Sequence, residues 1–96
     1  MGMPETIQKK RDEILRIARE YGASNIRVFG SVARGEADEM SDVDLLVSLA
    51  PGFGLLRHAA MIRELEALLG RKVDVISDKG LPPRIRERIL REAVPL

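Results

Sequence analysis

Apolar residues recur at helical spacing in three parts of the chain. These parts run from Thr6 to Tyr21, from Leu55 to Leu69 and from Pro83 to Ala93. Residues three or four positions apart share one face of a helix, so each part predicts a helix with an apolar face. Gly22 and Gly70 follow the first two parts and are typical helix stops, because glycine readily adopts the left-handed conformation that ends a helix.

Three shorter stretches alternate between apolar and polar residues, which predicts strands. We expect these strands at about Asn25–Phe29, Asp42–Leu49 and Lys72–Ser77. The second and third strands flank the helix at Leu55–Leu69, and a strand–helix–strand unit predicts that the two strands are parallel. Helices and strands mixed in this way predict an α/β fold built on one sheet.

Acidic residues occupy the same expected face of two strands. Asp42 and Asp44 are separated by one residue, so they project from one face roughly 6–7 Å apart. Asp74 has the matching place on the third strand, and the apolar Leu46 and Ile76 follow on that face. Neighbouring carboxylates repel one another unless a cation lies between them, and Mg²⁺ prefers carboxylate oxygens together with substrate phosphates. A single aspartate would indicate a solvated turn, but two strands with this pattern predict a metal site at one end of the sheet.

Gly30 and Ser31 follow the first strand and have the features of a phosphate-binding turn. Glycine lets the backbone approach a phosphate, and the serine adds a hydroxyl and free N–H groups. If this turn and Asp42 share a ligand, the first strand must be antiparallel to the second, so we expect a mixed three-stranded sheet. Arg34 either neutralises phosphate or pairs with a neighbouring acidic residue, and Gly35 is expected to have a positive φ.

The segment formed by residues 30–47, GSVARGEADEMSDVDLLV, resembles the signature of the nucleotidyltransferase superfamily that includes DNA polymerase β. That signature is Gly-Ser, about ten residues, Asp-x-Asp and a third carboxylate on a later strand, where Asp74 stands here. More narrowly, the segment resembles the minimal nucleotidyltransferases, small antitoxin-type proteins often paired with a HEPN-domain toxin. The resemblance implies a polymerase β-like palm with a mixed three-stranded sheet and about four flanking helices, over a single domain of residues 1–96.

The resemblance also implies a two-metal mechanism. Asp42 and Asp44 would hold the Mg²⁺ ion on the triphosphate of ATP, and all three aspartates, with Asp74, would hold the Mg²⁺ ion that activates the attacking hydroxyl. AMP would pass from ATP to that hydroxyl, with pyrophosphate leaving. About twenty residues follow Asp74, so we expect another molecule to supply the acceptor, namely a tyrosine of a partner HEPN toxin. The nucleotide-binding residues would be Gly30, Ser31 and Arg34.

Composition narrows the class of protein. The 96 residues are 45% apolar, which suffices for one core, and the 16 basic and 15 acidic residues nearly cancel. The sequence has no cysteine, no apolar run long enough to span a bilayer and no apolar leader at its N-terminus. We therefore expect a cytoplasmic protein that does not contact a membrane.

Two other functions fit parts of the sequence. A non-catalytic antitoxin could neutralise its toxin by occlusion, with the metal site vestigial or regulatory. The arginine-rich last helix could bind nucleic acid, but no aromatic residue interleaves with its arginines, which argues against this function. The helix at Leu55–Leu69 carries a second apolar set, which predicts burial on two sides or, where part of the set stays exposed, a surface for a partner.

The remaining polar residues of interest are expected to be ordinary. His58 is the one histidine and is expected at a surface or boundary, without a catalytic role. Asp38 and Asp78 are expected to be solvated in loops, and Ser41 to form local backbone hydrogen bonds.

Overall fold

The chain begins with two helices and two strands and then alternates between helix and strand, and the computed structural model describes residues 4–36, 38 and 41–96. The α-helices are α1 (Glu5–Lys9), α2 (Arg11–Glu20), α3 (Leu55–Leu69) and α4 (Pro83–Glu92). The strands are β1 (Ala23–Phe29), β2 (Val43–Leu49), β3 (Val73–Ser77) and β4 (Val94–Pro95). A short 3₁₀ helix, η1 (Asp78–Gly80), follows β3.

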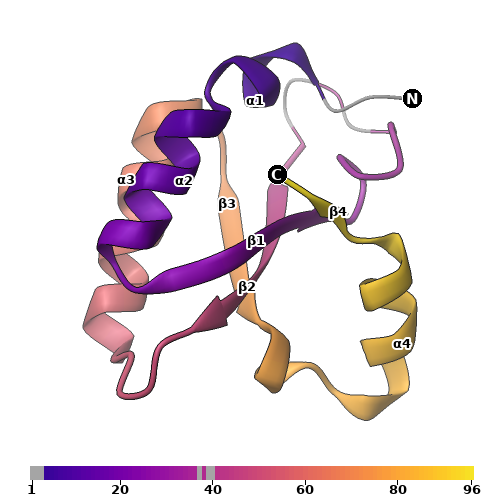
Figure 1. Cartoon of the computed structure of the whole chain (residues 1–96). Helices are drawn as coiled ribbons and strands as arrows, with labels where there is room; N and C mark the ends of the chain where they lie inside the picture. The colour runs from indigo at the N-terminus through magenta and orange to yellow at the C-terminus, as the bar shows by residue number, and fades with distance from the viewer. Residues whose placement is uncertain (1–3, 37, 39–40) are drawn as a thin grey trace.

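The strands form one mixed sheet in the order β3-β2-β1-β4 (Figure 1). β1 is antiparallel to β2 and β2 is parallel to β3, so both predicted directions are confirmed. The predicted number of strands is wrong, because the sheet has four strands rather than three and β4 pairs antiparallel with β1. β4 has only two residues, too few to show alternation, and Pro95 is a residue that is rare within sheets.

The first predicted helix is two helices. α1 ends at Lys9 and α2 begins at Arg11, and Lys10 between them has φ −102° and ψ 11°, outside the helical range. Ile7 and Ile14 lie close to two helical turns apart and are both fully buried. Because the apolar spacing continues across Lys10, the sequence pattern does not reveal the break.

The other boundaries shift little or not at all. α3 has its predicted bounds, and Gly70 ends it with φ +67°. β1 begins at Ala23, two residues before the predicted start, and carries Asn25 at φ +52° beside a register shift in its pairing with β2. β2 begins just after Asp42. None of the helices in the described ranges is long and apolar enough to cross a membrane.

Helices cover both faces of the sheet. α2 and α3 pack against each other and against one face, where the larger core cluster lies (Figure 1). On the other face, Phe29 and Leu46 pack against Leu81 and Ile89, the latter on α4. Of the apolar residues that follow the aspartates along the strands, Leu46 is fully buried and Ile76 is partly buried against the same cluster.

Candidate active site

Asp44 and Asp74 are neighbours on adjacent strands. They are Cα partners in the parallel pairing of β2 with β3, and Asp44 is also the Cα partner of Phe29 at the end of β1. Asp44 is half-buried, whereas Asp74 and Asp42, the residue before β2, are exposed. The structure thus gathers the predicted aspartates at the end of the sheet where β1 finishes.

The charges of these carboxylates act on one another. The pKa of Asp44 is raised above its ordinary value, first by burial and then by the negative charges of Asp74 and Asp42. Glu92 adds to the increase, and Arg34 opposes it. Ionised Asp44 therefore lies in a negative field that its surroundings only partly offset.

The donor set suits a hard divalent cation. Carboxylate oxygens are the ligands that Mg²⁺ prefers, and a cation would offset the field that raises the pKa of Asp44. Within the described part of the chain, however, no three acidic, histidine or cysteine side chains are gathered closely enough to hold a metal ion. Asp42 and Asp74 are exposed, so the three carboxylates would have to come closer together to complete such a site. A metal-binding role of the three aspartates therefore stays a prediction.

Gly30 makes room for Asp44. A Cβ atom built on Gly30 would lie 2.3 Å from Oδ2 of Asp44, and Gly30 has φ +76°, which other residues rarely adopt. Gly30 begins a single helix-like turn, in which its carbonyl accepts from the N–H of Arg34 at 3.1 Å and the carbonyl of Ser31 accepts from the N–H of Glu36 at 2.9 Å. Gly35 has φ +74°, as predicted. Positions 37, 39 and 40 of the motif lie outside the described residues.

Three successive N–H groups in this turn have no acceptor among the described residues. The N–H groups of Ser31, Val32 and Ala33 donate to none of the described residues. The first N–H groups of a helical turn are unpaired for geometric reasons and favour anions. The turn therefore offers donors for phosphate beside Asp44, as the sequence predicts, although the N–H of Gly30 is already used.

Arg34 is paired with two carboxylates. Its Nε donates to Glu36 at 2.9 Å and its Nη1 donates to Glu92 at 2.8 Å. These hydrogen bonds, the one to Glu92 first, raise the pKa of Arg34. The pairing that the sequence left open is thus observed, while Nη2 of Arg34 donates to no described acceptor.

Glu92 is the residue of the site that the sequence reasoning missed. Its carboxylate accepts from the N–H of Gly30 at 2.9 Å as well as from Arg34, although it is the last residue of α4. No motif includes it. The available signal was its position, because a carboxylate at the C-terminal end of a helix is unfavourable against the helix dipole unless a donor compensates.

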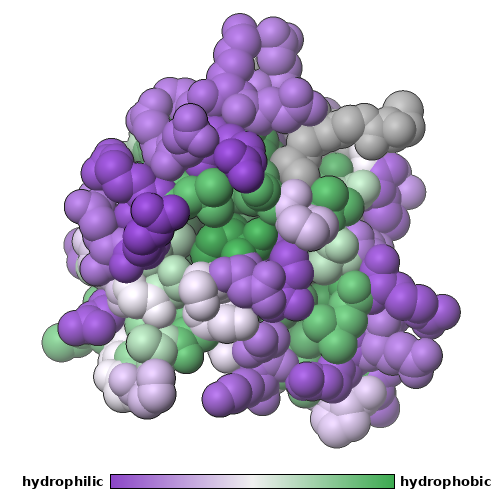
Figure 2. Space-filling model, viewed as in Figure 1, coloured by the Kyte–Doolittle hydropathy of each residue, from purple (hydrophilic) through white to green (hydrophobic). Residues whose placement is uncertain are grey.

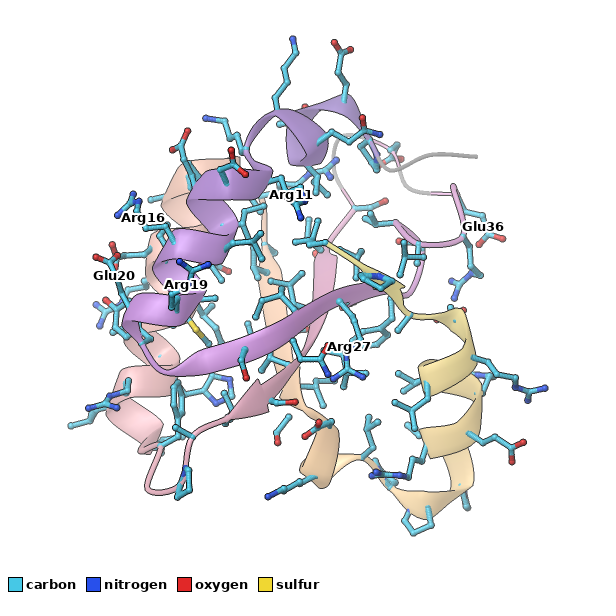
Figure 3. All side chains as sticks on the ribbon, viewed as in Figure 1. Arg11, Arg16, Arg19, Glu20, Arg27 and Glu36 are labelled. Atoms are coloured by element: carbon cyan, nitrogen blue, oxygen red, sulfur yellow. The ribbon has the colours of Figure 1, made fainter. Side chains whose placement is uncertain are left out.

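Asp78 is not solvated, so that prediction is wrong. Its carboxylate accepts from the hydroxyl of Ser48 at 2.7 Å and lies 3.6 Å from Nη2 of Arg27. The hydrogen bond from Ser48 is the largest cause of the lowered pKa of Asp78, and burial opposes it. Arg27 projects from β1 on the side of the sheet that faces α4 (Figure 3). A loop position does not predict this pairing, because it depends on the contact between η1 and β2.

The expected local hydrogen bond of Ser41 and the expected boundary position of His58 are confirmed. The hydroxyl of Ser41 accepts from the N–H of Asp38 at 3.0 Å, and Asp38 itself is exposed. His58 is half-buried, with Nε2 3.0 Å from the carbonyl oxygen of Val75. Neither residue forms a described hydrogen bond with Asp42, Asp44 or Asp74.

The second apolar set of α3 divides between the two alternatives. Met61 of this set is fully buried, whereas Leu56 in the first turn is 88% exposed. Leu56 is thus part of the remainder for which the sequence predicts a partner surface, and its neighbour Leu55, from the first apolar set, is 85% exposed as well.

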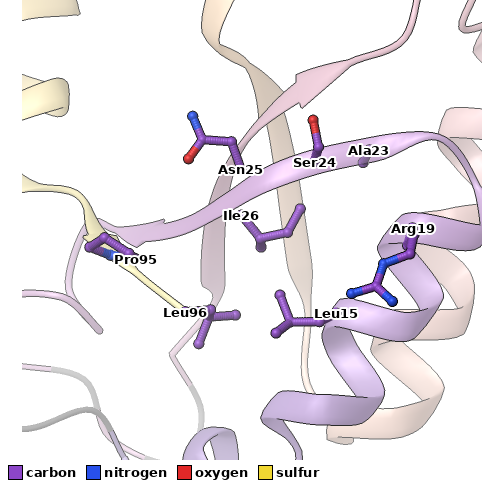
Figure 4. A pocket seen from close by; sticks show the side chains of 8 residues that line it. All are labelled: Leu15, Arg19, Ala23, Ser24, Asn25, Ile26, Pro95 and Leu96. Carbon is purple, nitrogen blue, oxygen red and sulfur yellow. The ribbon is translucent and has the colours of Figure 1, made fainter.

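A groove lies beside the first half of β1, away from Asp44. Its volume is about 340 Å³, and Leu15 and Arg19 of α2 face Ile26 of β1 and Leu96 across it (Figure 4). In the space-filling view an apolar area at the middle of this face is surrounded by hydrophilic residues (Figure 2). The groove borders the start of β1, whereas Asp44 pairs with its end, so the groove is separate from the acidic site.

The sheet order, the paired aspartates and the donor turn together define a palm-like domain with an acidic end beside a turn of N–H donors. The chain belongs to the nucleotidyltransferase family, because the nucleotidyltransferase domain matches residues 11–96. The resemblance to this family that the motif predicts is therefore confirmed, and the protein is a nucleotidyltransferase.

Individual relatives narrow the comparison. The protein adenylyltransferase MntA of Thermococcus cleftensis is 42% identical over 78 residues, which are 81% of this chain and 79% of MntA. A solved structure assigned as a minimal nucleotidyltransferase is 52% identical with a TM-score of 0.87, covering 99% of this chain and 97% of its own. A toxin–antitoxin crystal structure with AMP-PNP shares the fold with a TM-score of 0.76 at 19% identity, over 88% of this chain and 69% of its own.

Proposed function

We propose that this nucleotidyltransferase transfers AMP from ATP to a hydroxyl of a partner protein, a tyrosine of a HEPN-domain toxin, and thereby acts as an antitoxin. The observation that carries the proposal is the pairing of Asp44 with Asp74 beside the turn whose three N–H groups donate to no acceptor in the described part of the chain. The similarity to a protein adenylyltransferase and to a toxin–antitoxin structure with a nucleotide analogue supports the choice of AMP and of a toxin.

The aspartates would hold Mg²⁺ and the turn would hold phosphate. Asp42 and Asp44 would bind an ion on the triphosphate, and Asp74 would complete a second ion site with them. When bound, Mg²⁺ would neutralise phosphate charge and lower the pKa of the attacking hydroxyl. In the transfer, the acceptor oxygen bonds to the α-phosphorus, the bond from that phosphorus to the bridging oxygen breaks, pyrophosphate leaves and the hydroxyl proton passes to solvent.

The chain's own donors would orient the triphosphate. The N–H groups of Ser31, Val32 and Ala33 and the hydroxyl of Ser31 would donate to phosphate oxygens. Nη2 of Arg34 would supply a further positive donor, because its other two nitrogens are held by glutamates. These contacts would fix the α-phosphate near Asp44 and Asp74 for in-line attack.

Transfer of label from ATP tests the proposal. Full-length protein is incubated with ATP labelled at the α-phosphate, Mg²⁺ and the native HEPN partner, and the partner is then examined for label. We expect label on the partner with the wild type, and loss of at least about a hundredfold in rate for the double variant Asp42→Asn, Asp44→Asn, since a catalytic metal contributes several kcal/mol. Asp12→Asn, an exposed aspartate of α2, is the matched control and should leave the rate unchanged.

The same variants separate catalysis from occlusion. If the double variant still neutralises the toxin in a ribonuclease assay and the partner never acquires label, the chain acts by occlusion. If the label appears only when the partner's tyrosine is intact, the proposed acceptor is supported.

A further inference from the structure

Glu92 reaches from the end of α4 into the turn that begins at Gly30. Its Oε2 accepts from the N–H of Gly30 at 2.9 Å, and its Oε1 accepts from Nη1 of Arg34 at 2.8 Å. The side chain is only 19% exposed. One carboxylate thus joins two residues of the turn that are distant from it in sequence.

This carboxylate is fixed on both sides. α4 is anchored by Ile89, which packs against Phe29, the residue before Gly30, in the smaller core cluster. Burial tends to raise the pKa of Glu92, but the hydrogen bonds from Arg34 and Gly30 outweigh it and lower the pKa. Glu92 is therefore ionised at neutral pH and forms charge-assisted hydrogen bonds, which are stronger than neutral ones.

The contact decides which donors of the turn stay open. Because Glu92 occupies the N–H of Gly30, phosphate can use only the N–H groups that follow. On its other side Gly30 touches the carboxylate of Asp44, since a Cβ atom there would meet Oδ2 at 2.3 Å. Gly30 is thus held between two carboxylates, one at the end of α4 and one on β2.

We infer that Glu92 is a positioning residue of the nucleotide site. It holds Gly30 and Arg34 in place, so that the open N–H groups of Ser31, Val32 and Ala33 stay next to Asp44, and it acts without touching the nucleotide. This inference rests on the proposed function, because it requires that the turn binds the phosphates of ATP.

Equilibrium binding of ATP and amide exchange test the inference on the full chain. The variants are Glu92→Ala, Glu92→Gln and the control Glu87→Ala, an exposed glutamate of the same helix. We expect Glu92→Ala to raise the Kd for ATP with Mg²⁺ roughly tenfold and to speed hydrogen exchange of the Gly30 amide, as follows from loss of a charge-assisted hydrogen bond. Glu92→Gln keeps an acceptor for Gly30 but loses the charge for Arg34, so its Kd should lie between those of the wild type and Glu92→Ala. Glu87→Ala should have the same Kd as the wild type.

Several outcomes would overturn the inference. A folded Glu92→Ala that binds ATP as tightly as the wild type shows that Glu92 positions nothing, and tighter binding shows that it competes with phosphate. If Glu92→Ala does not fold, Glu92→Gln decides, and a Kd equal to the wild-type value defeats the inference. If the wild type itself binds no ATP, the proposed function fails and the inference fails with it. If the wild type transfers AMP and Glu92→Ala transfers it at the same rate, the inference fails but the proposed function stands.

Discussion

The two faces of the sheet use the same strands for different purposes. The face under α2 and α3 is apolar along its whole length, from Val43 through Leu45 to Val47 on β2, and it contains most of the buried residues. The cluster on the face toward α4 has four buried apolar residues in the described part of the chain, two from the sheet and two from the covering segment, and this face becomes acidic at one end, where Asp44 and Asp74 lie. One face therefore stabilises the fold, and the other gives up apolar area to position charges.

The division follows from strand geometry. Successive side chains of a strand point to opposite faces, so Leu45 enters the larger core while Asp44 and Leu46 on either side face α4. The site is built on a strand that the larger core holds rigidly. Packing of the larger core thus holds Asp44 in a position that would otherwise be unfavourable for a carboxylate.

Truncation of the two neighbouring leucines is expected to give the largest effects and to separate the faces. Leu45 and Leu46 are 1% and 0% exposed, so replacement of either by alanine should lower the free energy of unfolding by about 2–5 kcal/mol, measured by urea denaturation. Only Leu46→Ala should also weaken ATP binding in the folded protein, because Leu46 packs with Phe29 and Ile89 behind the site. Equal loss of ATP affinity in both variants would show that the faces are not functionally distinct.

Substitution of Gly30 is expected to have the next largest effect, and the chain contains a matched control. Gly30 and Gly52 have φ of +76° and +78°, but an added Cβ meets Asp44 at 2.3 Å in the first and nothing within 4 Å in the second. Each alanine variant should lose about 1–2 kcal/mol from backbone strain. Gly30→Ala should lose more than Gly52→Ala and should also lose AMP transfer, because the side chain of Asp44 must move.

Thermal denaturation and the label-transfer assay check this pair of variants. The difference in Tm between them measures the steric contact with Asp44, free of the shared strain. Identical Tm values with full transfer in Gly30→Ala would mean that Asp44 moves without consequence, and the glycine would then matter for its conformation only.

The sequence predicted the acidic end well because its signals are local. Alternation places Asp44 and Leu46 on one face, and parallel pairing then brings Asp74 beside Asp44. The element types, the α3 bounds and the strand directions follow from spacing of the same kind. Short-range periodicity and the motif were therefore sufficient for β1, β2 and β3, within one or two residues of their bounds, and for the turn at Gly30.

The parts that the sequence did not predict depend on contacts between distant segments. β4 is defined only by its pairing with β1, and Glu92 only by its hydrogen bonds to Gly30 and Arg34. Asp78 likewise differs from an ordinary loop aspartate because Ser48 and Arg27, both distant in sequence, lie next to it. No periodicity encodes such pairs, since each residue alone fits a solvated position equally well.

Asp44→Asn is expected to have the smallest effect on stability. It tests whether the acidic end of the face toward α4 weakens the fold that the other face stabilises. The pKa of Asp44 is raised above 3.8 in the folded protein, first by burial and then by Asp74 and Asp42. The folded state therefore holds a proton more tightly than the unfolded state, so this group's stabilising contribution is complete below 3.8 and is lost as the pH rises through the raised pKa. At neutral pH the ionised carboxylate weakens the fold, and Asp44→Asn should raise the free energy of unfolding by less than about 1 kcal/mol because solvent screens a partly exposed group.

Denaturation of Asp44→Asn and wild type, at neutral pH and below 3.8, measures this effect. The asparagine variant should be the more stable at neutral pH and equal to the wild type in acid, where Asp44 is protonated.

Addition of Mg²⁺ should raise the Tm of the wild type, since a ligand that binds only the folded state stabilises it, and should raise that of Asp44→Asn much less. A variant that is less stable than the wild type at neutral pH without Mg²⁺ would contradict the repulsion inferred here. A Tm that responds equally to Mg²⁺ in both proteins would place the ion away from Asp44, and the acidic end would then need another explanation than metal binding.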